Sequence, residues 1–258
     1  MNLLLLPPVR RLLLASVWLV LFLARAGAQL TDVPATVAPG RFLLEADVVS
    51  FALDREEGEK YSAFAVGSVL VTTGLTERLD LQAGVDLFVS EKYESSAGFS
   101  DRHSGVGHFY LRTKWRFHES ETSAAAVIPY AKIPNKSTNV GNRSVEGGVI
   151  VPFETKLPGA FLFNTQVGVD LLRNANDDGY DTSWSGTAVL TRDLTRRISL
   201  YAEAILNRST GGGGTIGTIG AGLYFTVTES LAWDFAVYRG ISRAATDWNP
   251  VVRCNLSF

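Results

Sequence analysis

Segments of about ten residues in which apolar and polar side chains alternate recur along most of this chain. In the stretch from Leu79 to Val89, every odd position is aliphatic, whereas the even positions carry Asp, Gln, Gly and Asp before a single Phe. This period of two gives a β-strand one apolar and one polar face, whereas a helix would scatter the charges around its circumference. The pattern therefore predicts an all-β chain.

The first 28 residues have the features of a secretory signal peptide. Arg10 and Arg11 precede the apolar run 12–24, and a small-x-small motif ends at Ala28, where we expect cleavage. The run is shorter than the roughly 20 apolar residues of a membrane-spanning helix. We therefore predict that residues 1–28 are removed and that the protein is exported.

Beyond residue 28 the chain holds no run of 18 consecutive apolar residues, which a transmembrane helix would need. A closed β-barrel is the other structure that satisfies every backbone polar group within a bilayer. Twelve alternating segments fit residues 40–258, and an even number is typical of bacterial single-chain barrels. They cover about residues 41–53, 61–73, 78–90, 105–117, 123–133, 146–156, 160–172, 183–191, 197–208, 215–226, 231–240 and 250–258.

The connections between these segments alternate in length. The short ones are 74–77, 118–122, 157–159, 192–196 and 227–230. The longer ones, mostly rich in Gly, Asn, Asp and Ser, are 54–60, 91–104, 134–145, 173–182, 209–214 and 241–249. Short periplasmic turns and longer external loops are typical of outer-membrane barrels. We therefore predict a transmembrane antiparallel up-and-down β-barrel over residues 40–258, with residues 29–39 as a short periplasmic lead able to enter the lumen.

The strand parity also predicts which side chains contact outer-membrane lipid. These are Phe109, Leu111, Trp115, Phe163, Val167, Leu200, Trp233 and Phe235, with Trp115, Phe117, Leu231 and Trp233 near the periplasmic interface. The last strand alternates in the same way and ends on the aromatic Phe258, which resembles the terminal signal read by the bacterial barrel-assembly machinery. That machinery is the expected partner during biogenesis. A soluble periplasmic β-sandwich is the alternative fold.

Composition excludes several classes of function. Lys and Arg number 24 against 26 for Asp and Glu, a net charge of −2, which argues against a nucleic-acid partner. The single cysteine, Cys254, excludes an internal disulfide and a cysteine-based zinc cluster. Three histidines leave little for a histidine-rich metal site. We expect no metal and no cofactor.

The segment Gly105–Phe117, GVGHFYLRTKWRF, resembles the "G-x-G-D-x-x-L-x-x-K-y-x-f" strand of the bacterial outer-membrane barrels named for the putative MetA pathway of phenol degradation. Shorter similar pieces are Gly74–Leu81, Leu200–Glu203 and Trp233–Ile241. The chain departs from the pattern at His108, where the family has Asp. The resemblance implies an outer-membrane channel or transporter that passes small molecules, and the family name implies aromatic or hydrophobic compounds.

The same alternation turns charged side chains toward the lumen. The candidates are the cations Arg112, Lys114 and Arg116, here called the basic stripe, and the acids Asp80, Asp86, Glu154, Glu203 and Asp234, with Glu45, Asp47, Lys132 and Arg253 on the same parity. One interpretation is a pore whose opposed acidic and basic walls orient a solute. The other is a structural barrel whose charges pair and plug the lumen, with Glu154, Glu203 and Asp234 facing the basic stripe.

An outer-membrane enzyme acting on lipids is the alternative from a different class. Such an enzyme needs a Ser–His pair on the lipid-facing surface near the external rim. His103 and Ser104 are neighbours on an extended segment and therefore point in opposite directions, and His108 alternates inward. We therefore predict no catalytic residues and no enzymatic activity.

Overall fold

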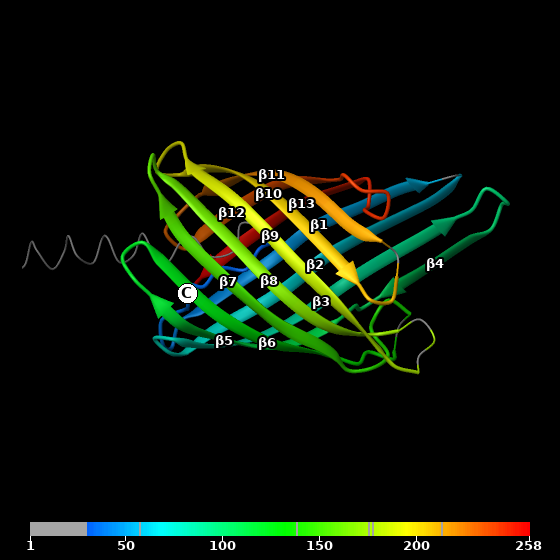
Figure 1. The fold of residues 1–258 in the computed structure, drawn as a ribbon, viewed down its shortest axis with the longest axis horizontal. Helices are drawn as coiled ribbons and strands as arrows, with labels where there is room; N and C mark the ends of the chain where they lie inside the picture. Colours follow the sequence, from blue (N-terminus) through cyan, green and yellow to red (C-terminus); the bar gives the residue numbers. More distant parts are fainter. Residues whose placement is uncertain (1–29, 57, 138, 175, 177, 213) are drawn as a thin grey trace, which may run out of the picture.

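The computed structural model describes residues 30–258 except 57, 138, 175, 177 and 213. The described chain forms one antiparallel sheet that closes on itself, because β2 pairs with both β1 and β3 (Figure 1). Its strands are β1 (Phe42–Glu56), β2 (Glu59–Thr76), β3 (Leu79–Glu94), β4 (Ser100–Gly105), β5 (Phe109–Glu119), β6 (Ser123–Ile133), β7 (Glu146–Leu157), β8 (Phe161–Arg173), β9 (Tyr180–Asp193), β10 (Ile198–Ser209), β11 (Thr215–Thr226), β12 (Leu231–Gly240) and β13 (Trp248–Ser257). None of these residues belongs to a helix long and apolar enough to cross a membrane.

Twelve strands build the barrel and β4 is an extra piece, which confirms the predicted all-β barrel. The prediction of one continuous strand over residues 105–117 is wrong, because β4 and β5 both pair with β3 and are separated by residues 106–108. At this break, Gly107 N–H donates to the Asp86 carbonyl (2.9 Å). A Cβ atom at Gly107 would lie 2.8 Å from the Asp86 Cβ, so only glycine fits.

Two connections predicted as loops contain β-structure instead. The β1–β2 pairing continues through Arg55 with Lys60 to Glu56 with Glu59. Residues 91–104 belong to the β3–β4 hairpin, which projects beyond the barrel end (Figure 1). Both were interpreted as loops because their charges hide the alternation. These charged side chains instead pair with each other across neighbouring strands, as in the Lys60–Glu94 ion pair between β2 and β3 (3.3 Å).

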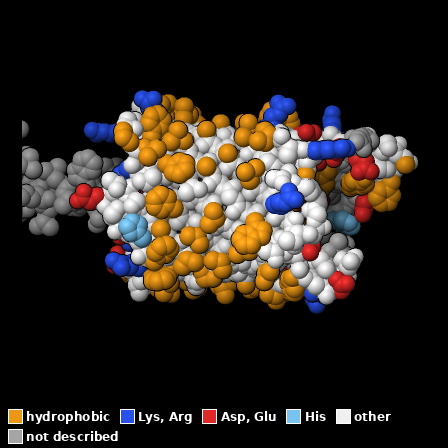
Figure 2. Space-filling view, viewed as in Figure 1, with side chains coloured by type: hydrophobic (Ala, Val, Ile, Leu, Met, Phe, Trp, Pro, Cys, Tyr) orange, Lys and Arg blue, Asp and Glu red, His pale blue; other side chains and the backbone are white. Residues whose placement is uncertain are grey.

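Burial in this barrel is inverted relative to a water-soluble protein. Apolar side chains cover the side of the barrel, whereas charged ones gather near its two ends (Figure 2). Val167 is 62% exposed and Trp115 53% exposed, while Asp80 and Asp234 are 0% exposed. An apolar exterior around a polar interior is the arrangement expected for a barrel surrounded by lipid.

The parity predicted for the outward side chains agrees with their exposure. Phe109, Leu111, Trp115, Val167, Leu200 and Phe235 are exposed, whereas Phe163 and Trp233 are half-buried. The aromatic rings also meet in pairs at the barrel end that carries the short turns, as in Trp115 with Phe117 and Phe42 with Phe258. Because successive strand residues point to opposite faces, the same parity turns the intervening charges inward.

Candidate functional site: a charged lumen around the N-terminal lead

Residues 30–39, the described part of the lead, lie inside the barrel. Thr31, Val33 and Thr36 are 1%, 6% and 8% exposed. The segment leaves the lumen at the end with the short turns, where Pro39 bridges to Gly74 at the end of β2. A Cβ atom at Gly74 would lie 2.1 Å from the Val37 carbonyl oxygen, so the lead can pass this close only because position 74 is glycine.

Glu203 on β10 holds the beginning of the described lead. Its carboxylate accepts hydrogen bonds from the Thr31 N–H (2.9 Å), the Thr31 hydroxyl (2.6 Å) and the Leu30 N–H (3.3 Å). Tyr238 OH also donates to Glu203, at 2.7 Å. Glu203 is only 3% exposed, and donors on several sides compensate for burying its charge.

The basic stripe contacts the lead and its surroundings. Arg112 forms an ion pair with Asp32 of the lead, and Lys114 Nζ donates to the Ala35 carbonyl (3.2 Å). Arg116 donates to the Glu77 carbonyl in the β2–β3 turn (2.8 Å) and pairs with Glu119 (3.1 Å). Two of the three cations therefore hold the lead against β5.

The acids that were predicted to face the basic stripe contact other groups, so that pairing is wrong. Glu154 accepts from Asn164 Nδ2 (2.8 Å), Glu203 holds the lead, and Asp234 bonds Arg253. The physical reason is the lead itself, which lies in the lumen and supplies Asp32 and a backbone carbonyl to the stripe.

Arg253 on β13 is the centre of a second network across the barrel. Its guanidinium bonds Asp234 (2.7 Å) and Asp47 (3.1 Å), and it is 5% exposed. Tyr201 OH donates to both carboxylate oxygens of Asp234 at 3.0 Å. The Tyr238 ring lies 5.7 Å from the guanidinium carbon. This network links β1, β10, β12 and β13.

The two remaining acids of the predicted set lie on β3. Asp80 is fully buried, accepts from the Val37 N–H of the lead (3.2 and 3.3 Å) and stands opposite Lys114 in the register. Asp86 accepts from the backbone N–H (3.1 Å) and bonds Nδ1 (3.0 Å) of His108. An aspartate at position 108, as in the family pattern, would place a second carboxylate beside Asp86.

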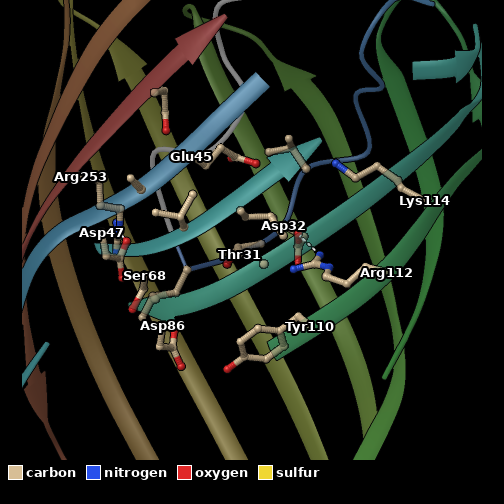
Figure 3. Close-up of a pocket in the computed structure, with 17 residues that line it drawn as sticks. Thr31, Asp32, Glu45, Asp47, Ser68, Asp86, Tyr110, Arg112, Lys114 and Arg253 are labelled. Atoms are coloured by element: carbon tan, nitrogen blue, oxygen red, sulfur yellow. Dashed lines mark hydrogen bonds and ion pairs between the residues drawn. The ribbon is translucent and has the colours of Figure 1, made fainter. Parts of the chain in front are cut away.

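A cavity of about 240 Å³ lies between the lead and the wall formed by β1, β2, β3, β5 and β13. Its lining includes acids and cations of the sequence-predicted set, with Asp32 and Arg112 facing each other at one side (Figure 3). Glu45 also lines it and makes no hydrogen bond or ion pair to the other described residues. The apolar side chains of Val33 and Leu70 complete the wall.

Sequence reasoning did not single out the lead residues Thr31 and Asp32, although they complete the site. No alternation marks them, because the lead is not a strand. Tyr201 and Tyr238 were on the inward parity, but nothing in the sequence distinguished them from other inward residues. Within the described ranges, no group of three or more His, Cys, Asp or Glu side chains is arranged to hold a metal ion.

A closed barrel with an apolar exterior, a charged lumen and an internal lead defines an outer-membrane β-barrel. The chain belongs to the family described as "Putative MetA-pathway of phenol degradation", whose model matches residues 27–258. The family resemblance carried by Gly105–Phe117 is thereby confirmed. The protein is located in the outer membrane.

Several solved structures share this fold. The COG4313 outer membrane channel from Pseudomonas putida F1 has a TM-score of 0.63 and 12% identity, covering 87% of this chain and 97% of that chain. The KdgM porin has a TM-score of 0.55 and 7% identity, covering 84% and 99%. The transport unit of the autotransporter AIDA-I from Escherichia coli has a TM-score of 0.57 and 8% identity, covering 95% and 98%. No curated relative matches the chain significantly.

Proposed function

We propose that this protein is a channel that passes small molecules across the outer membrane, with the lead narrowing its lumen. The observation that carries this proposal is the charged cavity of about 240 Å³ beside the lead. The lead is held by side chains and not by strand pairing along its length, so its contacts can be exchanged for those of a solute. The channels and porins of similar fold support the same class of function.

Aromatic or otherwise hydrophobic compounds are the solutes that we propose. The family name points to phenol degradation. The cavity lining also combines apolar side chains, among them Val33 and Leu70, with the Tyr110 ring and the charged groups. A ring bearing one polar substituent can therefore place its apolar part against β2 and its substituent near Glu45 or Arg112.

A lipid hydrolase is a weaker proposal. The His108 ring bonds Asp86, and no described serine hydroxyl bonds that ring. His118 Nε2 does lie 3.0 Å from Ser123 Oγ, but this pair is at the end with the short turns, and no described carboxylate orients the His118 ring. A triad needs the third group to hold the imidazole in place. We therefore propose no catalytic residues.

Planar-bilayer conductance of the refolded full-length protein, together with swelling of liposomes in arabinose, tests the channel proposal. We expect small stepwise conductance and measurable swelling, because the cavity beside the lead admits small solutes. The control is the same protein refolded with Val167→Arg, which places a charge in the lipid-facing surface and should reduce insertion. Absence of both conductance and swelling from correctly folded wild-type protein would contradict the proposal.

A further inference from the structure

The cavity beside the lead carries more acids than cations. Among the described residues, its charged lining consists of the acids Asp32, Glu45, Asp47 and Asp86 and the cations Arg112, Lys114 and Arg253. Two further acids lie beside these cations, because Asp80 stands opposite Lys114 in the register and Asp234 bonds Arg253. The described surroundings of the cavity therefore have an excess of negative charge.

The cations that line the cavity already have partners. Arg112 forms an ion pair with Asp32 of the lead, and Arg253 forms one with Asp234 at 2.7 Å. Lys114 Nζ donates to a backbone carbonyl of the lead at 3.2 Å. An anionic solute would have to displace acids from these cations, which would leave buried charges without partners.

Glu45 on β1 differs from the other acids of the lining. Asp32 and Asp47 bond arginines and Asp86 bonds a histidine, whereas no described residue donates a hydrogen bond to Glu45 or forms an ion pair with it. Lys114 attracts Glu45 electrostatically, but its ammonium group donates to the lead. The Glu45 side chain is half-buried and lines the cavity (Figure 3). It is therefore an acceptor open to a solute that carries a donor or a positive charge.

An apolar surface lies next to Glu45 in the same row of the lumen. Glu45 pairs with Leu70 across β1 and β2, Leu70 with Gly84 across β2 and β3, and Gly84 with Tyr110 across β3 and β5. Gly84 has no side chain, and a Cβ atom there would lie 3.1 Å from Leu70 Cδ1 and 3.5 Å from Tyr110 Cδ2. The row thus passes from a carboxylate to adjoining apolar groups within two strand spacings, about 10 Å.

We propose that this cavity selects aromatic amines, with the ammonium group bound by Glu45 and the ring packed against Leu70 and Tyr110. This inference rests on the proposed channel function and names the class of solute. An ammonium group donates to the Glu45 carboxylate without displacing any acid from the arginines. The solute ring and the Tyr110 ring can pack in an offset or edge-to-face arrangement. An aromatic carboxylate of the same size is repelled by Glu45 instead.

Ligand binding to the folded full-length protein in detergent micelles tests this selection. Isothermal titration calorimetry at neutral pH compares phenethylamine, which is a cation, with phenylacetate, an anion that carries the same ring. We expect phenethylamine to bind about tenfold or more tightly than phenylacetate, because a charge-assisted hydrogen bond to Glu45 is available only to the amine. This comparison uses the wild-type protein and does not depend on the folding of any variant.

Three variants locate the site. Glu45→Gln keeps the shape of the side chain and removes its charge, so it should weaken phenethylamine binding about tenfold without weakening phenylacetate binding. Leu70→Ala removes part of the apolar surface and should weaken both ligands about threefold or more. The matched control is Glu154→Gln, a lumen acid that bonds Asn164 and is not part of the cavity lining, and it should change neither. Correct folding of each variant is checked by the shift in gel mobility between unheated and heated samples.

The outcomes distinguish the selection from the channel function. Equal binding of the two ligands, tighter binding of phenylacetate, or unchanged phenethylamine binding in folded Glu45→Gln would overturn the selection. An equal loss in Glu154→Gln would overturn the assignment to Glu45. Wild-type protein that conducts in planar bilayers but binds neither ligand would overturn the selection and leave the channel function intact. Wild-type protein that binds phenethylamine selectively but gives neither conductance nor liposome swelling would overturn the channel function and leave the amine site in place.

Discussion

The two sides of the lumen differ in how they are held together. The wall of β10, β12 and β13 is joined by the Arg253 network, in which buried charges and tyrosine hydroxyls contact one another. The wall of β5, β6 and β7 lacks pairing between β5 and β6 at residues 128–129 and between β6 and β7 at residues 126–127. The inward side chains of β6 and β7 there, Ala126, Ile128 and Pro152, are apolar and buried. The difference teaches that one side is joined by buried charges and hydroxyls, whereas the other has fewer backbone pairs and apolar side chains around them.

The largest loss of stability is expected from breaking the Arg253 network in the wall of β10, β12 and β13. Arg253→Met removes the cation between Asp234 and Asp47 and leaves buried carboxylates without their partner, so it should lower the free energy of unfolding by about 3–5 kcal/mol. Urea unfolding in lipid vesicles measures this change. Arg208→Met, an exposed arginine on β10, is the control and should have little effect. A loss below about 1 kcal/mol for Arg253→Met would show that the network adds little.

The lipid face provides the next comparison. Val167 on β8 is 62% exposed on the outside of the barrel, so Val167→Arg should cost about 2–4 kcal/mol if its side chain lies near the middle of the bilayer. Folding into lipid vesicles, followed by the gel mobility shift, measures the cost. Val167→Leu is the matched control. Unchanged folding of the arginine variant would mean that β8 lies at a different depth.

The lead connects the two sides, and weakening its anchor should open the lumen. Glu203→Gln replaces a charged acceptor of the Thr31 and Leu30 N–H groups, at a cost of about 1.5–3 kcal/mol for the bound lead. The released population should rise about tenfold or more, seen as more frequent high-conductance openings in planar bilayers. Glu154→Gln, whose carboxylate bonds Asn164, should leave the openings unchanged. Equal behaviour of the two variants would argue against the lead as the narrowing element.

The smallest effect concerns the two strand prolines of this wall, Pro129 in β6 and Pro152 in β7. Each of Pro129→Val and Pro152→Val restores one backbone donor, so each should raise the free energy of unfolding by about 0.5–1.5 kcal/mol. Urea unfolding in vesicles measures the gain, and the two gains are expected to be non-additive because both changes act on β6. A loss of stability would show that proline fits these positions better than the missing pairs suggest.

The barrel followed from the sequence because alternation is a local signal. The segment Leu79–Val89 displays its two faces without reference to any other strand, and the inward placement of Asp80 follows from the same count. The break at Gly107 did not follow, because it depends on the close approach of Asp86 from another strand. Strands near the rim, such as Asp54–Glu56, were missed because both of their faces carry polar residues.

The site was predictable only in part. Alternation identified Arg112, Glu203 and Asp234 as inward residues, yet their partners depend on which strands lie close together across the lumen and on where the lead runs. Asp32 carries no periodic signal, and its contact with Arg112 joins residues 80 positions apart. The proline pairs were visible in the sequence, but their effect depends on which neighbour each missing N–H faces.

The pairing of β1 with β13 has a consequence for the order of assembly. Arg253 bonds Asp47, 206 positions earlier in the chain, so this contact requires the first and last strands to have met. Such a distant pairing has the highest entropic cost and is expected to form late. A nascent barrel that lacks β13 therefore leaves Asp234 without the Arg253 cation and leaves β1 and β12 unpaired on that side. The Arg253–Asp47 contact therefore forms only after β13 has been synthesised, and a chain shortened before this strand cannot form it.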